Sequence, residues 1–198
     1  MPAKNVYFGD LLFGGLQVRE SRIIAQYLLD ELSQEEWEQH ILTENSLQKR
    51  SQASAYRVAR GLQKRLTLLP LEFLQKLVVG DSTVARQICF LSMLLQSPVL
   101  KDFLKSQIHN ELKGYREHLA TYCWDEFLQE IESAGKAIPW SVTSRKKIRR
   151  TVWQVLAEVG YLTDPRTAQL QAMRIDPEVR TLLENSDLSF LISCLEVQ

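Results

Sequence analysis

Residues 48–69, with the sequence QKRSQASAYRVARGLQKRLTLL, contain the pattern that decides the fold. Apolar residues recur there at intervals of three and four, which places Val58, Leu62 and Leu66 on one face of a helix. The same spacing recurs along most of the 198-residue chain, which contains only 8 Gly and 6 Pro. The sequence therefore predicts an all-α fold.

Capping residues, proline and glycine set the boundaries of the predicted helices. Residues 33–36, Ser-Gln-Glu-Glu, have the capping-box pattern, in which the serine and the last glutamate bind free backbone amides at the start of a helix. Pro70 and Gly160 are typical of helix ends. The predicted helices cover residues 18–32, 33–42, 47–69 with Ser51 as an alternative start, 71–79, 82–96, 98–131 with a break at Gly114, a long helix from 141–144 to 160, and a short helix from Pro177.

The pattern changes after Gly160. Residues 163–165 predict a turn, and residues 169–175 alternate polar and apolar side chains, as a short strand does. We expect a short C-terminal β-hairpin, or wing, at this point. We interpret the chain as one helical domain, residues 1–198, subdivided into an N-terminal helix-turn-helix region 1–70, a central helical region 71–135 and a winged-helix-like region 136–198.

The longest apolar stretch, residues 88–95, is far shorter than the roughly 20 residues that span a bilayer. The N-terminal residues lack the apolar core of a signal peptide. We therefore expect a cytoplasmic protein that does not bind membranes. Cys89, Cys123 and Cys194 lie far apart and lack the spacing of a disulfide framework or a zinc site, so we expect buried free thiols.

Patterns of catalytic chemistry are weak in this sequence. Residues 46–49 and 144–147 match the Ser-x-x-Lys motif of acylating serine enzymes, but companion motifs are missing, and we interpret both matches as chance. His40, His109 and His118 do not have the spacing of metal ligands. We expect a non-enzymatic protein that uses neither a cofactor nor a metal ion.

Six aromatic side chains could offer stacking faces for single-stranded bases. Packing in the protein core is the alternative that we favour for them. They are Trp37, Trp124, Trp140, Trp153, Tyr115 and Tyr122.

The formal net charge is zero, which by itself argues against a nucleic-acid-binding protein. The basic residues are nevertheless concentrated in two windows, residues 45–71 and 133–157, each of which contains six Lys and Arg side chains and no acid. This distribution indicates an anionic partner. The cations are Lys49, Arg50, Arg57, Arg60, Lys64 and Arg65 in the first window, and Lys136, Arg145, Lys146, Lys147, Arg149 and Arg150 in the second.

Helical projection places most of these cations opposite the apolar faces of their helices. In the first window no acid stands three or four residues away, so the like charges repel by a few tenths of a kcal/mol per close pair. In the second window the cations lie in the N-terminal half of the helix, where the helix dipole favours negative charge. A phosphate at that end would satisfy both the free amides and the arginines. The alternative is that acids of neighbouring helices pair with these cations.

Two stretches are typical of helix-turn-helix units. In the first, the helix from Ser33 is followed by residues 51–60, with small polar residues early and cations after them, as in a helix that enters a DNA groove. In the second, the helix that ends at Gly160 leads into the predicted hairpin, which could carry Arg166 and Arg174 to the DNA backbone.

Several motifs occur along the chain in the order found in a known family. They are Phe13-Gly-Gly-Leu16, Glu20-Ser-Arg22-Ile-Ile-Ala25, Glu44-Asn45, Leu47-Gln-Lys-Arg-Ser51, Arg65-Leu66, Pro98-Val-Leu-Lys-Asp-Phe-Leu104, Trp140-Ser141, Leu156-Ala-Glu-Val-Gly-Tyr-Leu162 and Pro177-Glu-Val179. With these motifs the sequence resembles the BrxA family over nearly its whole length.

The resemblance implies a small accessory component of bacteriophage-exclusion (BREX) systems, in which a methyltransferase marks host DNA and other components block replication of unmarked phage DNA. It also implies an all-helical fold likened to the NusB antitermination factor, with two helix-turn-helix elements beside positive surface that contacts duplex DNA. By position, Lys49, Arg50, Arg57 and Arg60 match the first element, and residues 145–150 match the second.

Charge pattern and resemblance together predict a non-enzymatic component of a BREX system that binds double-stranded DNA through its phosphates, with little sequence preference. We expect a monomer, with other BREX components as further partners. A structured-RNA-binding protein and a protein-interaction adaptor remain as alternatives. The predicted DNA-binding residues are Lys49, Arg50, Ser51, Arg57, Arg60, Lys64, Arg145, Lys146, Lys147, Arg149 and Arg150.

Overall fold

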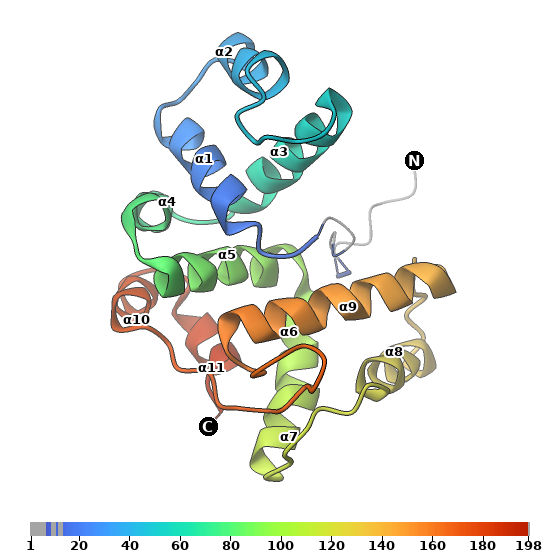
Figure 1. The fold of residues 1–198 in the computed structure, drawn as a ribbon. Coiled ribbons are helices and arrows are strands. Elements are labelled where there is room, and N and C mark those ends of the chain that lie inside the picture. Colours follow the sequence, from blue (N-terminus) through green and yellow to red (C-terminus); the bar gives the residue numbers. More distant parts are fainter. Residues whose placement is uncertain (1–6, 9–10, 12–13, 198) are drawn as a thin grey trace. The chain divides into compact units, whose positions relative to one another are not determined.

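Helices account for the regular secondary structure of residues 7–8, 11 and 14–197, the part of the chain that the computed structural model describes (Figure 1). The predicted all-α fold is confirmed. Contacts divide the chain into two compact units: unit 1, Met1–Gly15 with Gln96–Gln198, and unit 2, Leu16–Leu95. These limits differ from the subdivision expected near residues 70 and 135, and the interpretation as one domain stays a prediction.

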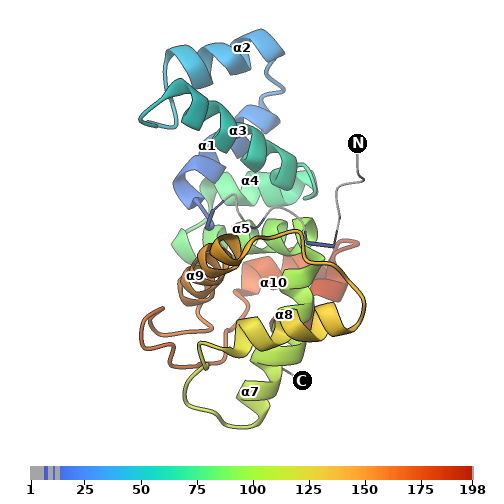
Figure 2. The ribbon, with the colours of Figure 1, turned by 90° about the vertical axis from the view of Figure 1, so that its right-hand side faces the viewer.

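Unit 2 is built around its first helix. Helix α1 packs against both α3 and α4, and both views show α1, α2 and α3 grouped together (Figures 1 and 2). The helices are α1 (Val18–Leu29), α2 (Gln34–Glu38), a π-helical turn η2 (Gln39–Thr43), α3 (Gln52–Leu66), α4 (Leu71–Val79) and α5 (Ser82–Gln96), whose last residue belongs to unit 1.

Local capping explains where the helices of unit 2 begin. Ser33 and Glu36 form the predicted capping box, in which the Ser33 backbone N–H donates to the Glu36 carboxylate at 2.9 Å. The Ser51 hydroxyl accepts a hydrogen bond from the Ser54 backbone N–H at 3.3 Å, so α3 begins at Gln52. The later of the two starts considered for this helix is therefore correct.

Two arginines tie the start of α1 to the rest of unit 2. Arg65, 1% exposed, donates to the Leu16 carbonyl and, at 3.2 Å, to the Ser21 hydroxyl. Arg22 donates to the carbonyls of Val78 at 3.2 Å and Gly80 at 2.5 Å, where α4 ends. The family-like residues of this region therefore hold the fold together.

Unit 1 has an aromatic core. The Phe103 ring lies 4.8 Å from the Trp124 ring, 5.3 Å from that of Phe127 and 6.0 Å from that of Trp153, measured between centroids. Its elements are α6 (Pro98–Phe103), a π-helical turn η3 (Leu104–Ile108), α7 (His109–Lys113), α8 (Cys123–Ser133), α9 (Val142–Val159), α10 (Pro177–Glu184), a 3-10 turn η4 (Ser189–Leu191) and α11 (Ile192–Leu195).

The helix predicted over residues 98–131 is interrupted for longer than a break at Gly114 alone would require. Residues 114–122 are not helical, because part of their backbone bonds to the C-terminal region. The Leu119 N–H donates to the Ala168 carbonyl, and the Leu170 N–H donates to the Glu117 carbonyl, both at 2.8 Å. The prediction of a nearly continuous helix was therefore wrong.

The predicted wing takes the form of isolated bridges. Leu162 pairs with Leu170, and His118 pairs with Gln169, both in antiparallel sense. Within the described part of the chain no ladder extends beyond these bridges, so the expected strand over residues 169–175 is not formed. Residues 168–170 instead lie between two short partners, residues 161–163 and 117–119.

Cys89, Cys123 and Cys194 are buried free thiols, as predicted. Burial, with the charges of three nearby glutamates, raises the pKa of the Cys123 thiol to about 12. Among the described residues, no single helix is long and apolar enough to cross a membrane. The bent pair Ser82–Gln96 and Pro98–Lys113 reaches that length and apolar character only when its two helices are taken together.

Candidate nucleic-acid interface

A row of cations lies on the outer face of α3. Arg57, Arg60 and Lys64 are exposed, whereas Val58 and Leu62 on the opposite face are buried. Arg50, just before the helix, is exposed as well. None of these four cations has an ion-pair partner among the described residues. The projection made from the sequence is confirmed for Arg57, Arg60 and Lys64.

Arg60 is held in place by two aromatic rings. Its guanidinium carbon lies 5.6 Å from the Trp37 ring centroid and 5.7 Å from that of Tyr56. The two rings contact each other edge to face at 5.9 Å, and Arg60 also donates to the Gln63 amide oxygen at 3.0 Å. The stack links α2, which carries Trp37, to the cationic row. The i, i+4 spacing of Tyr56 and Arg60 was a signal for part of this contact that the sequence interpretation missed.

Two other cations of the first window bond to other parts of unit 2. The Lys49 ammonium lies 2.7 Å from the Glu20 carboxylate, and the Asn45 side chain bonds to both the N–H and the carbonyl of Lys49 at 2.9 Å. Burial opposes ionisation of Glu20, but the hydrogen bond and charge of Lys49 lower its pKa overall. Lys49 and the buried Arg65 therefore stabilise the fold, and pairing with a neighbouring helix is correct for Lys49.

The cations of α9 also fall into two groups, one exposed and one paired with acids. Lys146, Lys147 and Arg150 are exposed, and no described residue forms an ion pair with them. Arg145 and Arg149 instead contact acids of α8: Arg145 binds both oxygens of Glu132, at 2.6 and 3.3 Å, and Arg149 lies 2.8 Å from Asp125. Acids of α8 thus compensate part of the charge at the start of α9 that seemed to oppose the helix dipole.

Three of the ten predicted cations, Lys49, Arg145 and Arg149, are therefore occupied by internal pairs. Ser51 is exposed, and its hydroxyl caps α3. Of the predicted DNA-binding cations, those that are exposed and have no ion-pair partner in the described residues are Arg50, Arg57, Arg60 and Lys64 of unit 2, and Lys146, Lys147 and Arg150 of unit 1.

In the two Ser-x-x-Lys matches, each serine hydroxyl forms a hydrogen bond with a group other than the lysine of the motif. The Ser46 hydroxyl donates to the His40 carbonyl at 2.8 Å, and the Ser144 hydroxyl accepts from the Ser141 hydroxyl at 3.0 Å. Among the residues described, no cluster of three or more His, Cys, Asp or Glu side chains is placed to hold a metal ion.

Comparison with known proteins identifies the family. The family model described as BrxA matches residues 6–187. The chain belongs to the BrxA family. A curated "BREX protein BrxA" from Paramagnetospirillum magneticum is 32% identical over 196 residues, 98% of each chain. Another from Escherichia coli O9:H4 is 33% identical over 193 residues, which cover 97% of this chain and 91% of that protein.

A solved structure supports the same relationship. A crystal structure described as an uncharacterized protein from Magnetospirillum magneticum superimposes with a TM-score of 0.87 and 30% identity, covering 98% of this chain and 100% of that one. The BrxA-family motifs quoted from the sequence include Arg22, Asn45, Lys49 and Arg65, and all four make internal contacts. These motifs therefore identify the BrxA fold more directly than they identify its ligand.

Proposed function

We propose that this BrxA-family chain is a non-enzymatic, double-stranded DNA-binding component of a BREX phage-defence system. It holds the duplex mainly through phosphates and with little sequence preference. The supporting observation is the row formed by Arg57, Arg60 and Lys64, which is exposed and has no acidic partner among the described residues. Unneutralised cations on one helix face repel one another, and a row of phosphates would remove that repulsion.

The arrangement of α2 and α3 supports a helix-turn-helix mode of binding. The turn η2, which continues α2, packs against α3, and residues 44–51 connect them. In such units the second helix enters the major groove while the first crosses the backbone. Helix α3 would be the groove helix, and Arg60 would reach the backbone already ordered by its stack on Trp37 and Tyr56.

Helix α9 and the bridged residues that follow it support a second contact with the duplex. Gly160 closes α9 in the left-handed conformation, with φ of 97°. The bridged residues after it present Arg166, which is exposed, beside a turn stabilised by Asp164. Lys146, Lys147 and Arg150, in the first half of α9, would add further phosphate contacts.

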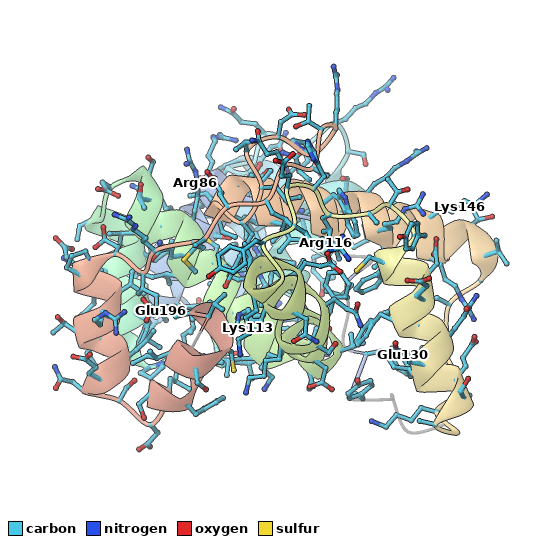
Figure 3. All side chains as sticks on the ribbon, turned by 90° about the horizontal axis from the view of Figure 1, so that it is seen from below. Arg86, Lys113, Arg116, Glu130, Lys146 and Glu196 are labelled. Carbon is cyan, nitrogen blue, oxygen red and sulfur yellow. The ribbon has the colours of Figure 1, made fainter. Side chains whose placement is uncertain are left out.

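Fluorescence anisotropy with a labelled DNA duplex tests the proposal. The double variant Arg57→Glu with Arg60→Glu should weaken binding strongly, because it places two negative charges against phosphates. Arg86→Glu is the matched control, since Arg86 is an exposed cation of the same unit on α5 (Figure 3). Equal binding by all three proteins would overturn the proposal. Tighter, charge-dependent binding of a hairpin RNA would favour the RNA alternative.

A protein partner is the second candidate, and exposed apolar side chains favour it. Leu68 is 46% exposed, Leu71 55% and Val79 78%, and all three lie between the end of α3 and the end of α4. Another BREX component could cover this region. Binding to a purified component that is lost in Leu71→Asp, while DNA affinity is unchanged, would show that the chain is an adaptor.

A further inference from the structure

Two tyrosines between α7 and α8 are far more exposed than the other aromatic side chains considered for stacking. Tyr115 is 93% exposed and Tyr122 61%, whereas each of the four tryptophans is at most 7% exposed. Neither tyrosine side chain contacts another described residue through a hydrogen bond or a ring. Core packing is therefore the correct interpretation for the tryptophans and the wrong one for these tyrosines.

The segment that carries them is held at several points. The Arg116 N–H donates to the Glu111 carbonyl at 3.0 Å, and residues 117 and 119 bond to the bridged region at 170 and 168. Tyr115 has a φ of 52°, a left-handed conformation that costs free energy for a residue with a Cβ. The fold thus presents this ring to solvent in a fixed backbone conformation.

Cations of α7 and α9 flank this segment, and Arg116 lies within it. Arg149 of α9 donates to the carbonyl of Thr121, directly before Tyr122, at 3.3 Å, which places α9 against the segment. Lys146 stands one turn before Arg149 and is exposed. Lys113 at the end of α7 is exposed. Arg116 is 74% exposed, and its guanidinium forms a long ion pair with the Glu111 carboxylate at 3.9 Å. Figure 3 labels Lys113, Arg116 and Lys146 on these elements.

We propose that Tyr115, Tyr122, Lys113, Arg116 and Lys146, here called the tyrosine surface, bind unpaired nucleotides. Bases stack on the two rings, and phosphates contact the three cations, which is how proteins bind single strands without reading sequence. The tyrosines lie seven positions apart in the sequence, so chain length limits the distance between their Cα atoms to about 25 Å, within reach of a few nucleotides. In a duplex the base faces are already stacked, so this site goes beyond the proposed duplex contact and does not depend on it.

Four labelled probes test the tyrosine surface by fluorescence anisotropy. One is a blunt DNA duplex, and the other three are the same duplex with a single-stranded extension of deoxynucleotides, of abasic nucleotides or of ribonucleotides. Each extension is about ten nucleotides long, which is within the usual site sizes. The abasic probe keeps the phosphates and removes the bases. The unpaired extension should raise the affinity of the wild-type protein about tenfold, and the abasic extension should raise it far less.

The variants separate stacking from a structural role. Tyr115→Ala with Tyr122→Ala should abolish the gain from the extension, whereas Tyr115→Phe with Tyr122→Phe should keep it because the rings remain. Phe190→Ala is the matched control, since Phe190 is 49% exposed in the same unit. The DNA and RNA extensions compared directly show which backbone is preferred.

Measurements on the wild-type protein alone can overturn the proposal. They would do so if the abasic and normal extensions raised the affinity equally, or if neither extension raised it. Equal losses in the phenylalanine and alanine variants would overturn it as well. Failure to bind the blunt duplex, together with tyrosine-dependent binding of the extended probe, would refute the duplex proposal and support this one.

Discussion

Replacing Arg57 and Lys64 together by glutamine isolates charge from structure. Both side chains are exposed on α3, and neither has a hydrogen-bond or ion-pair partner in the described part of the chain. Each phosphate contact that is lost should make the slope of log affinity against log salt less steep by about 0.9, so the pair should change it by about 1.8. When salt falls from 1 M to 0.1 M, the affinity of the wild-type protein should therefore rise roughly eightfold more, for each lost contact, than the affinity of the variant.

The slope of the wild-type protein carries separate information. The seven predicted DNA-binding cations that are exposed and have no ion-pair partner among the described residues set a limit of about −6, and the four of them in unit 2 alone would give about −4. A slope near −6 would mean that one duplex contacts the cations of both units. A slope near −4 that Lys146→Gln leaves unchanged would mean that only Arg50 and the α3 row bind.

Anisotropy titrations across a salt series measure these slopes, and urea unfolding measures stability. The double variant should stay within about 0.5 kcal/mol of the wild type in unfolding free energy, as surface changes do. Arg149→Gln is the control, because Arg149 contacts Asp125 and the Thr121 carbonyl. It should lose about 1 kcal/mol of stability and keep the wild-type slope. An unchanged slope in the double variant, or an equal change in Arg149→Gln, would refute the reasoning.

Three further predictions concern the fold. Leu62→Ala removes a fully buried side chain of α3 and should cost about 2 to 5 kcal/mol in urea unfolding, with unchanged DNA affinity of the folded fraction. Gly80→Ala places a Cβ 2.7 Å from the Lys76 carbonyl oxygen and 2.7 Å from a Val84 methyl carbon; urea unfolding should show a loss of about 1 to 3 kcal/mol. Burial, with the charges of Lys113 and Lys105, lowers the pKa of folded His109. The unfolded chain therefore binds the proton more readily, and the unfolding free energy should fall as pH decreases below about 6.5; a smaller fall in His109→Gln, measured over the same pH range, would check the assignment.

Helix starts and ends in this chain could be predicted because their causes are local. The capping box joins Ser33 and Glu36, three residues apart, and the Ser51 cap acts on Ser54. Gly160 adopts the left-handed conformation that its lack of a Cβ allows. In each case the interacting groups lie within one helical turn, so the sequence alone contains the information.

The interruption at residues 114–122 could not be predicted in the same way. Its backbone groups bond to residues 168 and 170, about 50 positions further along the chain. The apolar spacing of residues 98–131 is compatible with a continuous helix, and only the distant partner makes the break favourable. The exposure of Tyr115 and Tyr122 follows from that break, so the sequence could not separate them from the core aromatics.

The same distinction applies to the candidate site. Helical projection correctly placed Arg57, Arg60 and Lys64 at the surface, because exposure on one helix follows from its own apolar face. The partners of Lys49 and Arg149 are acids 29 and 24 residues away. Pairing of this kind depends on how helices pack, which charge windows do not encode.

Arg57 and Arg65 show why the position of a cation decides what it can do. They lie eight residues apart on α3, yet Arg65 is buried and bonded to Leu16 and Ser21, whereas Arg57 is exposed. Releasing Arg65 to a ligand would leave buried polar groups unsatisfied, which costs too much free energy for a binding role. Arg57 is already hydrated, so its contact with a phosphate gains mainly from the release of counterions, and that gain falls as salt rises. A salt titration therefore separates the cations that bind a polyanion from those that hold the helix in place, even within a single helix.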